Sequence, residues 1–140
     1  MSYIYGLLIT DGSLYLTTRN RGKIVLEVSE KDRDIIEKLV ETIPNSNIKI
    51  RTRSTMFKSN YTTFSFTNHR REFREELISY GFPIRDKTLL SSIPSVDYDE
   101  RYFWKGVIDG DGSIGITHCE QPEPFISLVT KSENLKENFL

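Results

Sequence analysis

The segment WKGVIDGDGSI at residues 104–114 repeats the segment IYGLLITDGSL at residues 4–14, at a constant spacing of 100 residues. Both segments place a glycine five residues before an Asp-Gly-Ser sequence, and apolar residues stand at matching positions. The pair Val28-Ser29 returns as Val129-Thr130, at a spacing of 101 residues. A repeat of this length indicates that the chain holds two copies of one structural unit.

The residues around and after the first segment predict the elements of one unit. An apolar run closed by Asp-Gly is typical of a helix, and two alternating runs joined by a turn are typical of a hairpin. A helix-start signature at Ser29 and a stop at Pro44 bound a second helix. The expected elements are a helix at residues 2–12, strands at 13–19 and 23–28, a helix between Ser29 and Pro44, strands at 48–54 and 60–67, and a helix at about 69–80.

The repeat divides the chain unequally. We expect a first repeat with its connection at residues 1–96, in the order αββαββα, and an incomplete second repeat at residues 97–140, with one helix, one hairpin and the start of a helix. The expected fold class is α+β with an antiparallel sheet. Because the second copy is shorter, we expect a truncated chain, or one that is completed by a complementing fragment or by a second copy in a homodimer.

The composition is typical of a folded domain. Of the 140 residues, 37% are apolar, and 19 Lys+Arg against 20 Asp+Glu give a formal charge of −1. The single Cys119 excludes an intramolecular disulfide. No apolar run near the N-terminus is long enough to cross a membrane, and no signal peptide is visible. These features predict an intracellular protein with no membrane partner. The absence of alanine departs from normal usage, and we expect the protein in the cytoplasm, in a phage-infected cell or in an organelle.

The two repeated helices carry small residues along one stripe. Gly6 and Thr10 in the first, and Gly106 and Gly110 in the second, stand at i and i+4 and share a helix face. Such stripes let two helices approach closely, which gives a reason for glycines that each cost a helix about 0.5 to 1 kcal/mol. The aspartates that end the two helices would then lie together, where helix dipoles and mutual repulsion favour a bound cation.

The repeated segments also resemble a known motif. GLLITDGSL and GVIDGDGSI are similar to the two copies of the LAGLIDADG motif, and GFPIRDKTLLSSIP followed by FWKGVIDGDGSI is similar to the join between the halves of single-chain LAGLIDADG homing endonucleases. The first copy departs from the pattern at Ile9, the earlier acidic position, and at Thr10, a small-residue position. The resemblance implies a site-specific double-strand DNA endonuclease, a hydrolase of the kind associated with intron or intein mobility.

The resemblance also implies which residues form the site. The last acidic residues of the two motifs, Asp11 and Asp111, would hold divalent metal, here Mg²⁺, and the backbone carbonyls of Thr10 and Gly110 would touch it. Such ions lower the pKa of attacking water and stabilise charge on phosphates. Lys87, in the connection, is the candidate for a catalytic basic residue near the scissile phosphates; the alternative is a solvated loop lysine.

Other interpretations of these residues are weaker. A single Asp-Gly is usually a turn that ends a helix, but two copies at matched spacing disfavour that explanation. The segment from Asp109 to Glu120 imitates an EF-hand calcium loop, although Ile114 stands where the sharp turn needs glycine. We assign Asp109 to the structure of the helix end, and Asn68-His69 to a helix start rather than an HNH-type nuclease.

The expected hairpins collect basic residues on one face. Ile48, Ile50, Phe64 and Phe66 are expected inside, whereas the opposite face and its turns carry seven basic residues against one acid, Glu27. A solvated face would normally mix signs, while basic residues interleaved with Tyr, Thr and Ser suit phosphates and base edges of double-stranded DNA. The expected DNA-binding residues are Tyr15, Thr17, Arg19, Arg21, Lys23, Lys49, Arg51, Arg53, Lys58, Tyr61, Thr63 and Ser65.

The imperfect first motif leaves a second interpretation open. A DNA-binding remnant or regulator of the same fold would bind in a salt-sensitive way and cut nothing. For an endonuclease, the shortened second repeat predicts weak binding and poor cutting.

Overall fold

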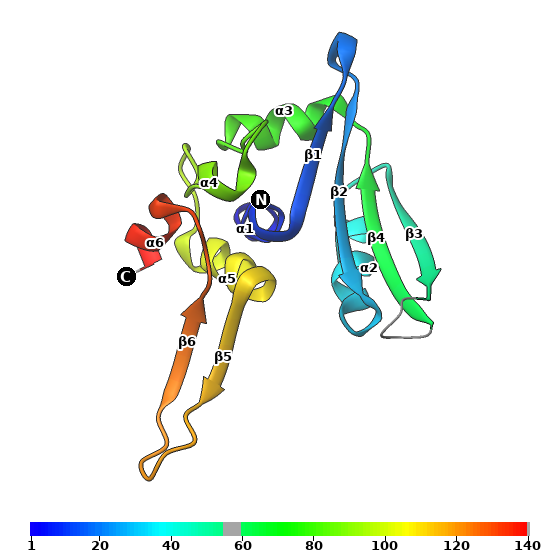
Figure 1. The fold of residues 1–140 in the computed structure, drawn as a ribbon. Helices are drawn as coiled ribbons and strands as arrows, with labels where there is room; N and C mark the ends of the chain where they lie inside the picture. Colours follow the sequence, from blue (N-terminus) through cyan, green and yellow to red (C-terminus); the bar gives the residue numbers. More distant parts are fainter. Residues whose placement is uncertain (55–59, 140) are drawn as a thin grey trace. The chain divides into compact units, whose positions relative to one another are not determined.

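The computed structural model describes residues 1–54 and 60–139, which divide between two compact units. The first, here called the helix-pair unit, combines Met1–Asp11 with Leu77–Leu140; the second, the sheet unit, is Gly12–Glu76. Both motif helices therefore belong to one unit. The elements, drawn in Figure 1, are α1 (Ser2–Asp11), β1 (Gly12–Leu16), η1 (Thr18–Asn20), β2 (Gly22–Ser29), η2 (Glu30–Asp32), α2 (Arg33–Thr42), β3 (Ser46–Arg53), β4 (Tyr61–Asn68), α3 (Arg71–Ser79), α4 (Lys87–Leu90), α5 (Glu100–Asp111), β5 (Gly112–Ile116), β6 (Pro124–Leu128) and α6 (Glu133–Phe139), where η marks a 3₁₀ turn.

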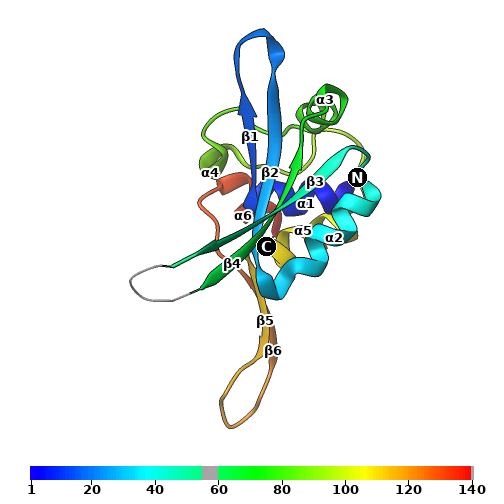
Figure 2. The same cartoon turned by 90° about the vertical axis from the view of Figure 1, so that its right-hand side faces the viewer.

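The sheet unit is a four-stranded antiparallel sheet in the order β1-β2-β4-β3. Alternation along the strands turns Ile24, Leu26 and Phe66 to one face, where they are fully buried. Helix α2 contacts β2, β3 and β4 and adds Ile36 and Leu39 to this core (Figure 2). The result confirms the predicted α+β class with an antiparallel sheet.

Three local features of the sheet unit differ from the predictions. The first strand is predicted to reach residue 19 but ends at Leu16, and the 3₁₀ turn η1 follows it. The helix predicted after Ser29 begins with the 3₁₀ turn η2, so α2 itself starts at Arg33. Ile48 and Ile50, expected inside, are 39% and 61% exposed. Their strand, β3, is at the edge of the sheet, so only one side of it is covered by a neighbouring strand.

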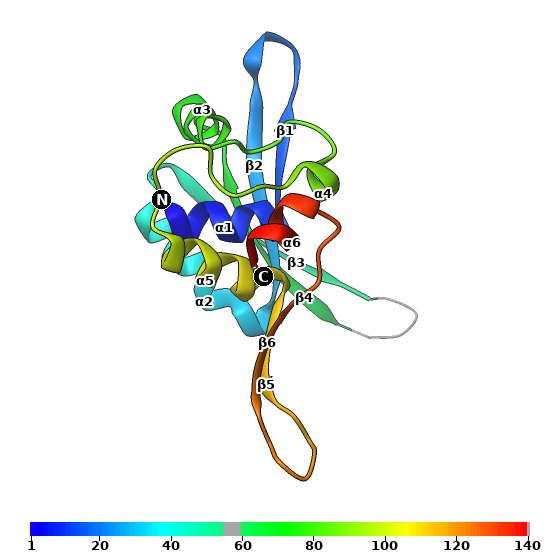
Figure 3. The ribbon, with the colours of Figure 1, turned by 90° about the vertical axis from the view of Figure 1, so that its left-hand side faces the viewer.

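The helix-pair unit is built on α1 and α5, which pack side by side (Figure 3). Leu8 and Val107 are fully buried there, and the ring of Tyr5 lies 6.1 Å from that of Phe103 and 6.2 Å from that of Phe82. Burial raises the pKa of Tyr5 to about 12, because the phenolate cannot be hydrated inside the unit. The short helix α4, which no periodicity predicted, lies in the connection between α3 and α5.

The second hairpin, β5–β6, repeats the pairing of the first. Gly112 pairs with Leu128 as Gly12 pairs with Leu26. The first strands of the two hairpins are thus 100 residues apart and the second strands 102 residues apart, so the second hairpin is two residues longer than the first. That spacing of 102 differs by one from the 101 that the sequence match predicted. Helix α6 follows β6, as α2 follows β2, and within the described residues β5 and β6 form a sheet of two strands.

Candidate functional site

Glycines bring the backbones of α1 and α5 into direct contact. A Cβ atom at Gly6 would lie 2.2 Å from the carbonyl oxygen of Phe103, and one at Gly106 would lie 2.2 Å from that of Tyr3. Real Cβ atoms essentially never come within 3.0 Å of such atoms. The two helices therefore meet along the stripe of small residues, and only glycine fits at these two positions.

The same contact continues to the C-terminal ends of both helices. A Cβ atom at Gly110 would lie 2.0 Å from Thr10 Oγ1 and 3.1 Å from Asp11 Oδ2. The Thr10 hydroxyl donates to the carbonyl of Leu7 at 2.8 Å, which holds its side chain against its own helix. The end of α5 and the carboxylate of Asp11 thus lie next to each other.

Asp11 and Asp111 are the last residues of α1 and α5, and both are exposed. The C-terminal end of a helix carries partial negative charge, so a carboxylate there is disfavoured unless a cation is close. One cation near these helix ends is Lys87, at the start of α4. Its ammonium group donates a hydrogen bond to the carbonyl of Thr10, at the end of α1.

Burial and nearby charge have opposite effects on Lys87. Partial burial lowers the pKa of Lys87 below its ordinary value, and the negative charges of Asp11 and Asp111 act in the opposite direction. Lys87 and Asp111 line the same pocket, and the Lys87 ammonium contacts the carbonyl of the residue that precedes Asp11. The structure brings together the three residues that the sequence named as catalytic candidates.

A pocket of about 250 Å³ adjoins this cluster. Its polar lining comes from three segments of the helix-pair unit: the end of the motif helices, α4, and the loop after β6. Lys131, from that loop, was missed by the sequence analysis. The pairing of β6 with β5, which sets Leu128 opposite Gly112 directly after Asp111, brings this loop to the pocket. The polar side chains that line the pocket are Thr10, Lys87, Thr88, Ser91, Asp111, Thr130 and Lys131.

Asp109 has a different environment from the two terminal aspartates. Its carboxylate accepts a hydrogen bond from the hydroxyl of Tyr3 at 2.9 Å and forms an ion pair with Lys105 at 2.5 Å. The bond from Tyr3 ties α5 to α1, whereas the ion pair with Lys105 lies within α5. The geometry fits a structural part for Asp109 at the helix end.

The donor atoms of the cluster suit a hard cation. In the part of the chain that the structure describes, no three His, Cys, Asp or Glu side chains gather as a ready-made metal cage. Mg²⁺ is commonly held by only one or two carboxylates, with water and substrate phosphate completing its coordination. The two carboxylates at the helix ends are donors of the kind that Mg²⁺ takes.

The sheet unit carries the candidate DNA-binding residues on the face opposite its core. We call this the polar face. Cross-strand pairs define it: Tyr15 stands opposite Lys23, Lys49 opposite Ser65, Arg51 opposite Thr63, and Arg53 opposite Tyr61. Its remaining members on β1 to β4 are Ser13, Val25, Glu27, Ser29, Asn47 and Thr67.

Most of the candidates on the polar face are accessible, but two are not. Tyr15, Lys49, Arg51 and Arg53 are exposed, and Lys23 lies with its ammonium 5.4 Å from the centre of the Tyr15 ring. Thr63 and Ser65 are only 6% and 5% exposed, contrary to the expected open face. They sit on the inner strand β4, where Ser65 lies between Glu27 and Lys49 and Thr63 lies between Ser29 and Arg51.

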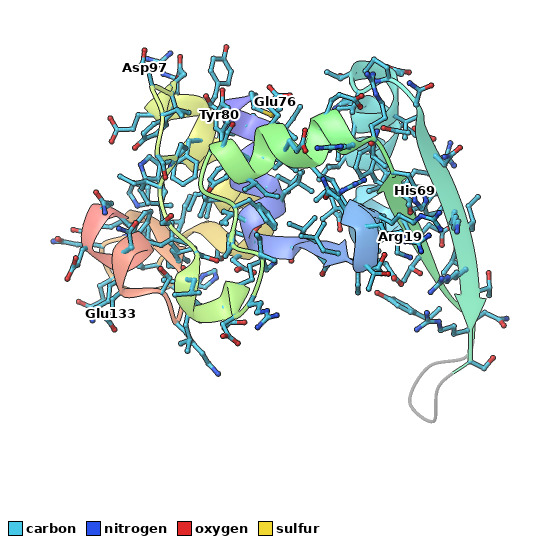
Figure 4. All side chains as sticks on the ribbon, turned by 90° about the horizontal axis from the view of Figure 1, so that it is seen from above. Arg19, His69, Glu76, Tyr80, Asp97 and Glu133 are labelled. Atoms are coloured by element: carbon cyan, nitrogen blue, oxygen red, sulfur yellow. The ribbon has the colours of Figure 1, made fainter. Side chains whose placement is uncertain are left out.

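The turn between β1 and β2 presents further basic residues. Arg19 and Arg21 are exposed there, and Arg19, labelled in Figure 4, adopts φ 61° within η1. The Thr17 hydroxyl closes the turn by donating to the carbonyl of Arg21 at 3.1 Å. Lys58, the other turn residue that the sequence named, lies outside the described residues.

No helix in residues 1–54 or 60–139 is long and apolar enough to cross a membrane. No family model matches the sequence, and no curated protein matches it. Among solved structures, the chain is similar to a lysine-to-alanine mutant of I-SmaMI, a LAGLIDADG homing endonuclease, with 14% sequence identity and a TM-score of 0.49. The match covers 89% of this chain and 65% of that structure, so the chain spans somewhat less than two thirds of the length of I-SmaMI.

Proposed function

We propose that this protein is a site-specific, double-strand DNA endonuclease of the LAGLIDADG type, which hydrolyses phosphodiester bonds with Mg²⁺ held by Asp11 and Asp111. One observation supports it above the others. The ammonium group of Lys87 bonds to the carbonyl of Thr10, the residue before Asp11, and Lys87 lines one pocket with Asp111, so one lysine adjoins the terminal aspartates of both motif copies. Two carboxylates and a lysine at one point form a site for a metal ion and a phosphate.

Each residue of the cluster has a distinct part in this proposal. Asp11 and Asp111 would hold the metal, and the carbonyl groups of Thr10 and Gly110 would add neutral oxygen atoms beside them. When bound, Mg²⁺ supplies positive charge against the phosphate and lowers the pKa of the attacking water. Lys87, already held by the carbonyl of Thr10, donates to a phosphate oxygen and stabilises the charge that develops there.

The polar face supplies DNA binding. Its lysines and arginines contact phosphates, and its hydroxyl and phenol groups reach base edges, as strands do when they enter the major groove. A strand rises about 3.3 Å per residue, so the eight-residue strands β3 and β4 follow about 7 to 8 base pairs. We further propose that a second copy of the chain, or a complementing fragment, completes the shorter β5–β6 sheet.

Paired substitutions at the helix ends test the nuclease proposal. Asp11→Asn and Asp111→Asn each remove a metal-binding charge while keeping the side-chain shape, so cleavage of a supercoiled plasmid library with Mg²⁺ should fall by about 100-fold or more. DNA binding, measured by gel shift without metal, should be retained. Asp109→Asn is the matched control, because it makes the same change in α5 on a carboxylate that contacts Tyr3 and Lys105.

The outcomes separate the two candidate functions. Cleavage that survives in both Asp11→Asn and Asp111→Asn would contradict the assignment of the site. A wild-type chain that binds duplex DNA but cuts nothing with Mg²⁺ or Mn²⁺ would instead be a non-cleaving DNA-binding protein. That alternative is favoured by Ile9, which stands at the earlier acidic position of the first motif and is buried.

A further inference from the structure

Glu27 is the single acidic residue among the members of the polar face. It lies on β2, opposite Ser65 of the central strand β4, and its side chain is exposed. Among the described residues, neither Lys49 nor Arg51 forms an ion pair with it, although both belong to the same face. A function as a partner for these basic residues therefore does not explain Glu27.

The carboxylate of Glu27 is oriented by a buried neighbour. Thr63, which is 6% exposed, donates its hydroxyl hydrogen to Glu27 Oε1 at 2.7 Å. Thr63 itself is fixed on the central strand, opposite Ser29 on one side and Arg51 on the other. A carboxylate accepts about four hydrogen bonds through its two oxygens, so the bond from Thr63 orients the group and leaves most of its acceptor capacity.

A fixed carboxylate is costly on a surface that binds DNA, because it repels phosphates. The cost is offset if the carboxylate accepts a hydrogen bond from a base. In the major groove, cytosine presents an N4 amino group and no acceptor at that edge, and Glu and Asp are the side chains that pair with it. We propose that Glu27 reads the amino group of one cytosine in the target; the inference rests on the proposed DNA binding by the polar face.

The substitution Glu27→Gln tests this reading with little change of shape. The Gln oxygen can still accept from Thr63, but the second terminal atom becomes an amide nitrogen that donates. Gln pairs with the N6 and N7 atoms of adenine. The preferred base at one position of the target should therefore change from cytosine to adenine, by at least about five-fold in relative retention.

Two further variants separate base reading from general charge. Thr63→Val removes the orienting hydrogen bond and keeps the carboxylate, so the cytosine preference should weaken at that same position without a change of base. Lys49→Gln removes a phosphate contact, so binding should weaken to all sequences alike, and the slope of log affinity against log salt should fall by about 0.9.

The experiment is selection of bound duplexes from a randomised library at low salt, with sequencing of the retained DNA for the wild type and the three variants. The inference is supported if a position that selects cytosine in the wild type selects adenine in Glu27→Gln and in neither of the other variants. Identical selected sequences for the wild type and Glu27→Gln, or a position where the wild type prefers another base, would overturn it. Failure of the wild type to retain any duplex would instead refute the proposed DNA binding itself.

Discussion

Gly106 lies where the backbone of α5 meets that of α1. A methyl group there would come within 2.2 Å of the Tyr3 carbonyl oxygen and 2.8 Å of the Leu7 nitrogen, and neither backbone atom can rotate away. We expect Gly106→Ala to lower the free energy of unfolding by about 1 to 3 kcal/mol in urea denaturation, although Ala is otherwise the better helix former. Gly6→Ala should behave alike, because its methyl group would meet the Phe103 carbonyl.

Gly115 provides the control for this prediction. It lies on β5, and a methyl group there would meet the ring tip of Phe125, which can turn aside. We expect Gly115→Ala to change stability by less than about 0.5 kcal/mol. If Gly106→Ala proved as stable as the wild type, the close contact of α1 and α5 would be wrong.

The helix α3 holds the β1–β2 turn through one arginine. Arg74 is 3% exposed, and its guanidinium donates to the carbonyls of Asn20 at 2.7 Å, Gly22 at 3.0 Å and His69 at 2.5 Å. Asn20 follows Arg19 in the turn, and both have positive φ. The β1–β2 turn, which presents basic residues at the end of the sheet, is thus held by the buried guanidinium of Arg74.

Arg74→Lys keeps the charge, but an ammonium group cannot reproduce the planar set of donors by which the guanidinium contacts the three carbonyls. We expect the free energy of unfolding to fall by about 1 to 3 kcal/mol, because at least one of the three carbonyls loses the hydrogen bond from this buried side chain, and we expect weaker DNA binding despite the unchanged net charge. Urea denaturation and filter binding check the two effects. Arg71→Lys is the control: it lies on the same helix, exposed and paired with Glu75 at 2.6 Å, and should cost less than about 0.5 kcal/mol. Equal losses for the two variants would contradict the role of Arg74.

Across the whole molecule, periodic and repeated features could be predicted from the sequence, whereas features set by neighbours could not. The alternation of β2 and β4 gave their positions to within a residue or two, because one face of each strand packs on the core. The exposure of Ile50 and the burial of Thr63 depend on strand order, which a single strand does not encode. Similarly, the motif pointed to Asp111, whereas Lys131 reaches the same pocket only through the return of β6.

The two sheets of the molecule differ in how their edges are covered. In the sheet unit, β2 has β1 on one side and β4 on the other, whereas β6, its counterpart, has only β5 among the described residues. Strands β5 and β6 carry no charged residue, and their paired residues Ile114 and Ile126 are 70% and 59% exposed. An uncharged, apolar edge strand is a template for another strand.

We therefore expect the chain to associate with itself through β6 as its concentration rises, with a mass above 16.3 kDa in light scattering. Ile126→Lys places a charge on this edge and should return the chain to the monomer mass, because two such edges would repel each other. Ile84→Lys is the control, since Ile84 is 52% exposed but lies in the connection between α3 and α4. A wild-type chain that stays at 16.3 kDa at all concentrations and cuts DNA efficiently would show that the β5–β6 sheet needs no partner.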